Sequence, residues 1–502
     1  MPTSLEPVYI VEGNAAYPDT PPYHPDTLYP EYPFRALPET VSANPNPAYA
    51  AVRDMLRALR LDAAHWGTPT WNPLGDLVGA GQTVLLKPNW VTHKVHGVSE
   101  GTERVLDCLV THTSVLRALI DYAIIAVGPS GTIVVADAPI QGTTFELLQE
   151  RCNMPELLTF YARHTQTTIE VHDLRATGII TAPDGRILEH LHLTGDPLGY
   201  TRVDLGDRSA LVTIDGTSKL YRSFDYESSA TVSAHSRGKH EYLISRSVLS
   251  ADLVINVPKL KTHIKAGITS ALKNLVGING NKAFLPHYRL GAPAERGDEY
   301  PLRNWFLKMK SEYRYHLAHY PPIIREPIKR AGNFLLSLSL AKRSSDNIGG
   351  VDPYLVTGGN WHGNDTTWRM VIDLNQILRY TSADGVLHDT PQRQVLSIVD
   401  GLVGGEGNGP LSPRPRPLGK MVGGFNPVTI DAVCARLIGF DWRKLALLRE
   451  GAKLLASTDN LDAVEIRGVD GMAQRLADLP HADFVAPRGW QSYIELSEQQ
   501  TS

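Results

Sequence analysis

Four short apolar runs that each end in polar residues constrain the fold of this chain more than any other feature. The runs begin near Thr83, Thr132, Leu253 and Val395. Between the first two, Thr113 opens a stripe of apolar residues at helical spacing. A strand, a helix and a second strand in this order indicate a parallel βαβ unit with a right-handed crossover. We therefore predict an α/β fold built on a mostly parallel sheet with βαβ units.

A chain of 502 residues is long enough for two to four domains. Changes in composition and in hydrophobic pattern along it predict five segments. Dense proline and tyrosine before Asn46 predict an ordered arm, packed on this chain or on a second subunit of a homo-oligomer. The predicted segments are the arm at 1–47, a first part of the α/β core at 48–300, a helical insertion at 301–357, a second part of the core with a glycine-rich loop at 358–470, and a tail at 471–502.

Turn residues in the middle of the first core part predict a β-rich segment at about 165–245, with a strand at 210–214. Helices are predicted to begin near Asn46 and at Thr113, and to cover Thr366–Tyr380 and Pro427–Ile438. A segment compatible with a helix follows at Gly267–Val276.

Charge and composition exclude several classes of protein. The net charge of −4 argues against a nucleic-acid binder, which would carry a basic excess. The three cysteines, Cys108, Cys152 and Cys434, cannot form a disulfide framework or hold an iron–sulfur cluster by themselves within one chain. No signal peptide is visible, and the most apolar helix-like stretch, 334–341, is far shorter than a membrane span. A cytoplasmic protein with no membrane or nucleic-acid partner is the expectation.

The polar residues that end the four runs predict a common site. In open α/β sheets, ligands bind at the carboxyl ends of the strands. Strands also end in Lys or Asp simply because the chain reaches solvent there, so the argument rests on the four ends together. The residues are Lys87 and Asn89 after the first run, Asp137 after the second, Lys259, Lys261 and His263 after the third, and Asp400 after the fourth.

The third run opens a basic segment that suits an anionic substrate carrying phosphate or carboxylate. Its basic residues are Lys259, Lys261, Lys265, Lys273, Lys282, His263, His287 and Arg289. His263, Lys273 and Lys261 are the predicted catalytic residues, because histidine and buried lysine can be tuned toward neutral pH to move a proton. Lys87, Asn89, Lys259, His287 and Arg289 are predicted to bind substrate. The alternative is a solvated basic face.

Residues 400–410 read DGLVGGEGNGP, and five glycines in eleven residues predict a loop. Asp400, Glu406 and Asn408 offer the hard oxygen ligands that Mg²⁺ or a similar divalent cation prefers, with Asp137 as a further ligand or an orienting carboxylate. The alternative is an ordinary glycine loop with two turn carboxylates.

A polar and aromatic cluster spans the start of the helix predicted at Thr366. Asn364 and Arg369 within it are predicted to contact the substrate. The alternative for Asn364 or Asp365 is a structural role as the cap of that helix.

Taken together, these stretches resemble the domain-of-unknown-function 362 (DUF362) family. The matching stretches are VLLKPNWV, THTSVLRALIDYA with VVADAP, LVINVPKLKTHIKAGITSALKNLVG, LPHYRLGAPAERGDEYP, GNWHGNDTTWRMVIDLNQIL and the long segment from IVDGLVGGEGNGP to ARLIGFD. They run from about residue 83 to 441, with gaps. The resemblance implies a family but no settled reaction. Some relatives carry a ferredoxin-like domain, and with three cysteines this chain departs from them.

The chain is also distantly similar to the nickel-pincer lactate racemase family, where a basic, His-containing segment likewise follows a strand. Lys261, His263, Lys273 and His287 would align loosely with that segment. The similarity assigns no nickel cofactor, but it keeps proton or hydride transfer at a carbon centre among the reactions to consider.

The function predicted from the sequence is an enzyme that acts on a small anionic metabolite with the help of a divalent cation, its reaction type unresolved. One alternative is an organic-cofactor enzyme of the pincer type, with lysine or histidine holding the cofactor. The other is a non-catalytic protein that binds a ligand or a partner, for example through the N-terminal arm.

Overall fold

The computed structural model describes residues 5–95, 103–181, 187–223, 228–302 and 356–497, together with residues 307, 311, 327 and 328. Its α-helices are α1 (Pro47–Ala58), α2 (Thr113–Val127), α3 (Phe145–Arg151), α4 (Met154–His164), α5 (Ser228–Ala234), α6 (Arg246–Ser250), α7 (Ala271–Asn274), α10 (Thr367–Tyr380), α11 (Pro427–Leu437) and α12 (Ala446–Leu455). The predicted helical insertion at 301–357 lies almost entirely outside the described residues.

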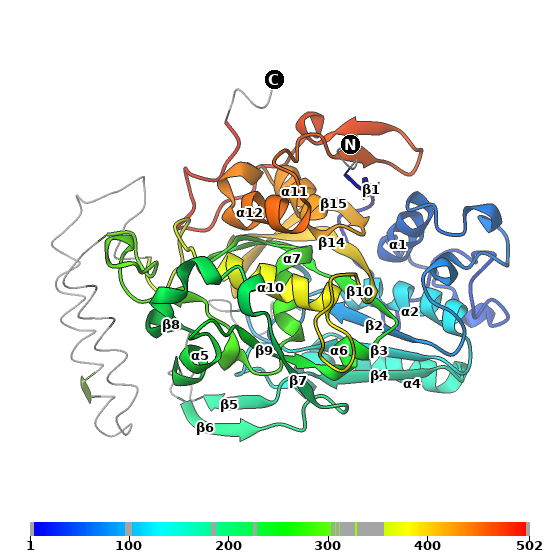
Figure 1. Cartoon of the computed structure of the whole chain (residues 1–502). Helices are drawn as coiled ribbons and strands as arrows, with labels where there is room; N and C mark the ends of the chain where they lie inside the picture. Colours follow the sequence, from blue (N-terminus) through cyan, green and yellow to red (C-terminus); the bar gives the residue numbers. More distant parts are fainter. Residues whose placement is uncertain are drawn as a thin grey trace.

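A large mixed sheet forms the centre of the molecule (Figure 1). Its strands are β1 (Val8–Glu12), β2 (Thr83–Pro88), β3 (Thr132–Asp137), β4 (Thr168–Asp173), β10 (Leu253–Val257), β11 (Lys259–His263), β12 (Gly267–Thr269), β14 (Gln394–Asn408), β15 (Ser412–Gly424), β16 (Glu465–Arg467) and β17 (Ala473–Arg475). The order is β17-β16-β1-β15-β14-β10-β2-β3-β4, with β11 beside β14 and β12 beside β11. Neighbours from β14 to β4 run parallel, which confirms the predicted α/β fold.

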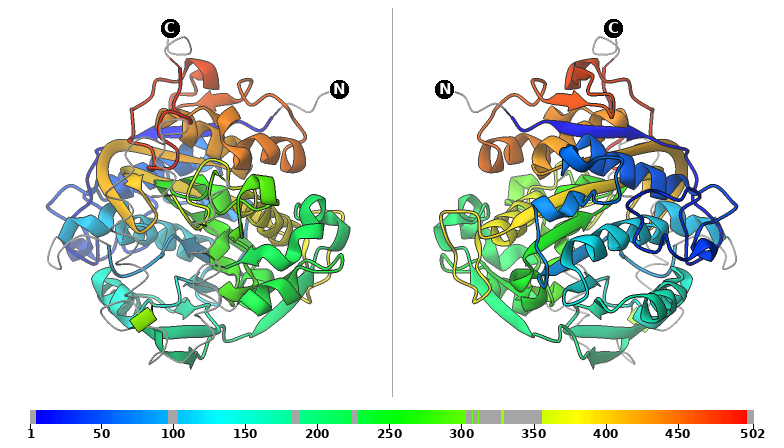
Figure 2. Two further views of the ribbon diagram at one scale, coloured as in Figure 1. Left: turned by 90° about the vertical axis from the view of Figure 1, so that its left-hand side faces the viewer. Right: turned by 90° about the vertical axis from the view of Figure 1, so that its right-hand side faces the viewer.

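Helices cover both faces of this sheet, and the strands are apolar on both faces for that reason. Val84 and Leu86 of β2 pack with α1, α2 and α4, whereas Leu85 between them packs with α7, α10, α11 and α12. Figure 2 shows these two helical layers from opposite sides. Each layer buries its own hydrophobic cluster, so the sheet is a continuous apolar partition between two cores.

Local signals set the ends of the helices that flank the site. Asn46 caps α1 by accepting the backbone N–H of Tyr49 at 3.1 Å. The ring of His112 caps α2 by accepting the N–H of Ser114 at 3.1 Å. Gly128, at a φ of +65°, then ends α2 in a conformation that favours glycine. The predicted starts of both helices are confirmed.

The proline- and tyrosine-rich arm is ordered and packs on its own chain. Tyr17, Tyr23 and Tyr32 are each less than a tenth exposed. The Asn46 side chain ties the arm to α1 by donating to the carbonyls of Tyr23 and His24, each at 3.0 Å. A homo-oligomer formed through the arm stays a prediction.

The β-rich middle contains three two-stranded sheets built from β5 (Thr177–Thr181), β6 (Ile187–His192), β7 (Tyr200–Asp204), β8 (Tyr221–Arg222), β9 (Glu241–Ser245) and β13 (Tyr288–Arg289). The strand predicted at 210–214 is wrong, because a 3-10 helix begins at Val212. The Asp373 carboxylate of α10 accepts the N–H of Ala210 at 2.7 Å and the hydroxyl of Ser209 at 2.5 Å. A side chain therefore takes the hydrogen bond that a neighbouring strand would have made.

The helix-compatible segment at 267–276 is divided in the structure. β12 takes its first residues, α7 follows, and a 3-10 helix begins at Leu275. The side chain of Asp431, from α11, caps α7 by accepting the N–H groups of Ala271 and Leu272 at 2.6 and 3.1 Å. This long-range cap holds α7 against the sheet.

The glycine-rich segment at 400–410 is not a loop, and that prediction is wrong. β14 continues to Asn408 and forms a long hairpin with β15. The glycines permit close packing: a Cβ on Gly405 would lie 2.7 Å from the carbonyl oxygen of Cys108, and one on Gly401 would lie 2.7 Å from that of Lys420. The many glycines in this segment therefore indicate a strand that other parts of the backbone approach closely.

No helix in the described ranges is long and apolar enough to cross a membrane.

Candidate functional site

The carboxyl ends of the four predicted strands lie on one edge of the sheet. In the parallel pairing of β10 with β2, Asn256 lies beside Lys87 and Val257 beside Pro88. β11 continues directly from β10, and its Lys259 lies beside Asp400 of β14. The four strand ends therefore lie along one edge of the sheet, and the structure divides their polar residues into two groups.

The first group is centred on a buried ion pair between Lys87 and Asp137. Lys87 Nζ lies 2.7 Å from Asp137 Oδ1, and both side chains are at most 4% exposed. Asp137 also accepts the backbone N–H groups of Trp90 at 2.6 Å and Ala138 at 2.8 Å. A Cβ on Gly277 would lie 1.9 Å from the Asp137 oxygen and 2.5 Å from Lys87 Nζ, so glycine is required for this pair to form.

Asparagines join this pair to the surrounding elements. Asn274 at the end of α7 donates to Asn256 Oδ1 at 2.8 Å and to the Lys87 carbonyl at 3.1 Å. Its own Oδ1 accepts from Asn89 Nδ2 at 2.9 Å. Within the described residues, the buried Asn89 Oδ1 and the hydroxyl of Thr269 have no hydrogen-bond partner. Unsatisfied buried polar atoms are costly, and they are common where a ligand or water completes a site.

Three further lysines surround the pair, and we call Lys87, Lys261, Lys273 and Lys282 the lysine cluster. All four are buried. Lys261 donates to the carbonyl of Leu109, and Lys282 donates to that of Val276 at 2.9 Å. Across the described part of the chain, Lys273 Nζ makes no hydrogen bond, and Lys87 is the member that forms an ion pair.

Lys261, Lys273 and Lys282 are buried without an ion pair among the described residues, which makes their amines unusually easy to deprotonate. Burial, together with the charge of Lys87, lowers the pKa of Lys273 to about 8. Burial also lowers the pKa of Lys261 and that of Lys282 to about 7, although the charge of Asp137 raises both. Lys261 and Lys282 therefore lose their protons near pH 7, and Lys273 does so about one pH unit higher.

Two histidines next to the cluster are held in opposite tautomers. His263 Nδ1 accepts the backbone N–H groups of Lys265 at 3.0 Å and Ala266 at 3.2 Å, so the proton of the neutral ring is on Nε2. His287 Nδ1 lies 2.8 Å from the Leu285 carbonyl, which can only accept, so its Nε2 carries the lone pair. Burial and the nearby lysine charges lower the pKa of His287 to about 3 and that of His263 well below its usual value. His263 Nε2 is thus a donor and His287 Nε2 an acceptor.

The second group is a compensated pair, Lys259 with Asp400, covered by Tyr17 of the N-terminal arm. Lys259 Nζ lies 2.6 Å from Asp400 Oδ2 and 2.6 Å from the Tyr17 hydroxyl. That hydroxyl donates to Asp400 Oδ1 at 2.5 Å. The backbone N–H of His112 also donates to Asp400, at 3.1 Å, and the His112 ring stacks on Tyr17. We call Tyr17, Lys259 and Asp400 the capped pair; its polar atoms bind one another.

The predicted cation ligands do not come together in the structure. Asp400 and Asp137 belong to the two different groups, each with a lysine partner. Glu406 accepts the N–H of Val485 at 3.1 Å, and Asn408 accepts that of Arg488 at 3.0 Å. Among the residues that the structure describes, no group of three or more His, Cys, Asp or Glu side chains is arranged to hold a metal ion. A divalent cation stays a prediction.

Three predicted substrate-binding residues occupy structural positions at the start of α10. Asn364 accepts the N–H groups of Thr366 and Thr367 at 3.1 and 2.8 Å, so it caps the helix. Arg369 and Arg289 both bind the carboxylate of Asp365, at 3.0 and 3.1 Å. Asn364 Nδ2 also donates to the carbonyl of His287 at 2.9 Å. Asn364 therefore holds the backbone of His287, whereas Arg289 and Arg369 anchor Asp365.

Residues 216–436 match the family model described as "Domain of unknown function (DUF362)". The chain carries a DUF362 domain. The matched range includes Lys261, Lys273 and His287, while Lys87 and Asp137 lie outside it. The resemblance drawn from the sequence is confirmed over these residues, and the more distant similarity to nickel-pincer lactate racemases stays a prediction.

One solved structure similar to this DUF362-containing chain is that of a protein from Thermotoga maritima. The two are 9% identical in sequence, with a TM-score of 0.29. The alignment covers 74% of this chain and 54% of the other, so the chain spans about half the length of that protein. A search of curated proteins finds no match.

Sequence reasoning missed three residues that shape the site. Lys282 was part of the basic segment but was not among the predicted site residues, and Tyr17 and Gly277 carried no visible signal of their roles. Tyr17 is 242 residues from Lys259 in sequence, and Gly277 is defined by what a side chain there would strike. Only the excess of lysine over acidic residues in the basic segment pointed toward Lys282.

Proposed function

We propose that this protein is an enzyme that binds a small phosphate- or carboxylate-bearing substrate at the lysine cluster and uses Lys273 to move a proton. The observation that carries the proposal is the charge balance of the cluster. Four buried amines share the ion-paired carboxylate of Asp137, and Lys273 has no hydrogen-bond partner among the described residues.

Buried charges are normally paired, because removing an ion from water is costly. The capped pair follows that rule, with one carboxylate for one lysine. The lysine cluster departs from it, and a substrate anion would supply the missing negative charge. Binding would raise the pKa of Lys261 and Lys282 and so strengthen the charge-assisted hydrogen bonds that they donate.

A general base must be partly neutral at the working pH and must lie near the proton it removes. The pKa of Lys273, about 8, meets the first condition. The neutral ring of His263, with its proton on Nε2, can donate to an oxygen that gains negative charge when a neighbouring carbon is deprotonated. These properties favour proton transfer at a carbon next to a carbonyl or carboxyl group, on a substrate that is also anionic.

The test follows deuterium from D₂O into a panel of carboxylated and phosphorylated carbonyl compounds by proton NMR. Wild-type protein should exchange the C–H next to the carbonyl of at least one compound. Lys273→Met should abolish the exchange. Lys273→Arg should still bind the compound but should not exchange it, because arginine keeps the charge and cannot serve as a base near neutral pH.

The exposed Lys219 provides the control, and Lys219→Met should exchange at the wild-type rate. Tight binding without exchange by wild type would contradict the catalytic proposal and favour the non-catalytic alternative. Exchange that persists in Lys273→Met would remove Lys273 from the mechanism.

A divalent cation and a cytoplasmic location remain proposals beside this one. Calorimetric titration of the dialysed protein with Mg²⁺ tests the cation directly. Because Glu406 pairs with Arg414 and Lys259 pairs with Asp400, Glu406→Gln is the variant that would weaken a site on the β14–β15 hairpin without unpairing Lys259.

A further inference from the structure

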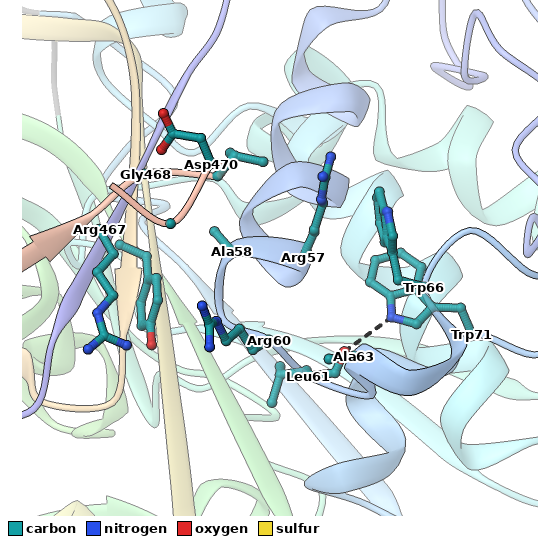
Figure 3. A pocket seen from close by; sticks show the side chains of 13 residues that line it. Arg57, Ala58, Arg60, Leu61, Ala63, Trp66, Trp71, Arg467, Gly468 and Asp470 are labelled. Carbon is teal, nitrogen blue, oxygen red and sulfur yellow. Dashed lines mark hydrogen bonds between the residues drawn. The ribbon is translucent and has the colours of Figure 1, made fainter. Parts of the chain in front are cut away.

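A second basic site lies at a different part of the sheet. A cavity of about 210 Å³ opens where the end of α1 meets the turn between β16 and β17 (Figure 3). In the sheet, β15 and β14 separate β1 and β16 from β10 and β2. The lysine cluster and the capped pair contribute no residue to its lining. We call it the arginine pocket, after Arg57, Arg60 and Arg467 in its wall.

The wall of the pocket has an excess of positive charge. Its lining contains three arginines and one acidic residue, Asp470. Asp470 accepts a backbone N–H of its own turn at 3.0 Å, and Arg467 pairs with Glu465, which lies outside the lining. Over the described ranges, the guanidinium groups of Arg57 and Arg60 make no hydrogen bond or ion pair. Each therefore retains its full set of N–H donors.

Aromatic packing holds part of this wall in place. The Arg57 guanidinium lies 4.6 Å from the centre of the Trp66 ring, and that of Arg53 lies 4.1 Å from it. Glu31 anchors Arg53 at 2.6 Å, and Trp66 packs edge-on against Trp71 at 4.6 Å. Stacking restricts the rotamers of Arg57 before any ligand arrives, which lowers the entropic cost of binding.

The three arginines line one cavity. Figure 3 shows the Arg60 side chain between those of Arg57 and Arg467, which extend away from it on opposite sides. Arg60 Nη2 also lies 3.7 Å from where a Cβ on Gly471 would be, so this side chain reaches across to the β16–β17 turn. Guanidinium groups bind carboxylates and phosphates through paired, parallel hydrogen bonds, and several around one cavity suit more than one negative charge.

We propose that the arginine pocket binds a small organic dianion, a phosphate monoester or a dicarboxylate, as a site separate from the lysine cluster. The volume sets an upper limit on the ligand, since it is below the roughly 300–1,000 Å³ of sites for drug-sized molecules. Arg57 and Arg60 hold one charged group through their free donors. Arg467, across the opening, holds the other charged group of the ligand. It either keeps its ion pair with Glu465 or gives that pair up for the ligand.

Isothermal titration of the full chain with two probes, 2-phosphoglycolate and succinate, tests this site. At least one probe should bind wild type with a dissociation constant below about 1 mM. Arg60→Gln and Arg467→Gln should each weaken that binding at least tenfold, and their thermal midpoints should stay at the wild-type value because both side chains reach solvent.

Two controls separate the pocket from other sources of binding. Arg416→Gln removes an exposed arginine of β15 outside the pocket, and it should bind as wild type does. Lys273→Met should also keep the binding, so the pocket and the proposed catalytic site can fail independently. Absence of binding by both probes, or equal weakening by Arg416→Gln and Arg60→Gln, overturns the proposal.

Discussion

The capped pair and the lysine cluster are built from the same residue types at the same edge of the sheet, and their charge balance differs. Lys259 and Asp400 neutralise each other, and Tyr17 bonds to both. In the cluster, Asp137 neutralises Lys87 and leaves Lys261, Lys273 and Lys282 without an ion pair within the described residues. A buried lysine is therefore structural or available for chemistry according to how many carboxylates share its space.

The largest expected effect comes from making the same substitution in both groups. Lys259→Met leaves Asp400 buried without its cation and should lower the free energy of unfolding by about 3–5 kcal/mol. Lys273→Met removes a cation that is unpaired in the described part of the chain, and should raise that free energy by about 1–3 kcal/mol at neutral pH. Urea unfolding followed by circular dichroism measures both. Equal losses in the two variants would show that the groups do not differ as described.

The pH dependence of stability sharpens the comparison, and its sign follows from the lowered pKa values. Lys261 and Lys282 lose their protons in the folded protein at about pH 7, but hold them to about pH 10.4 when unfolded. The unfolded chain then binds more protons, so stability should rise with pH through this window. The range with the least interference is about pH 7.5 to 8, because Asp373 and Asp431 titrate near 7 and unfolded cysteines are half ionised at about pH 8.5.

In that range the free energy of unfolding should increase by at least about 1.4 kcal/mol per pH unit. Saturating pyrophosphate should reduce this slope, because an anion favours the charged amines that face it. The charged and titratable groups that face Lys261 and Lys282 are Lys87, Cys108, Asp137, Arg175, Lys259, His263, Lys273 and His287. Chemical denaturation at a series of pH values gives the slope, and a flat or falling profile without ligand would contradict the lowered pKa values.

The smallest expected effect is that of the arm on the capped pair. Tyr17→Phe removes one hydroxyl that donates to Asp400 and accepts from Lys259, and leaves the ion pair itself intact. The loss should be about 1–2 kcal/mol in the free energy of unfolding. Tyr29→Phe, at a half-buried tyrosine of the same arm, is the matched control and should change stability less. A loss as large as that of Lys259→Met would mean that Tyr17, rather than Lys259, holds Asp400 in place.

Local patterns predicted the regular elements well, because they depend on contacts close in sequence. The starts of α1 and α2 follow from Asn46 and Thr113, and the parallel core follows from alternating apolar runs and helices. The same reasoning failed at 210–214 and at 400–410. In both places the deciding partner is distant: Asp373 takes the N–H of Ala210, and β15 pairs with the glycine-rich strand.

The sequence by itself determined the composition of the site: which strand ends carry Lys87, Asp137, Lys259 and Asp400, and that lysine outnumbers acid in the segment that follows β10. Only the tertiary structure decided which lysine meets which carboxylate. Ion pairing depends on separations of a few ångströms between atoms that lie far apart along the chain, and burial multiplies its consequence for the pKa. Tyr17 reaching Asp400 across 383 positions of sequence is the clearest case.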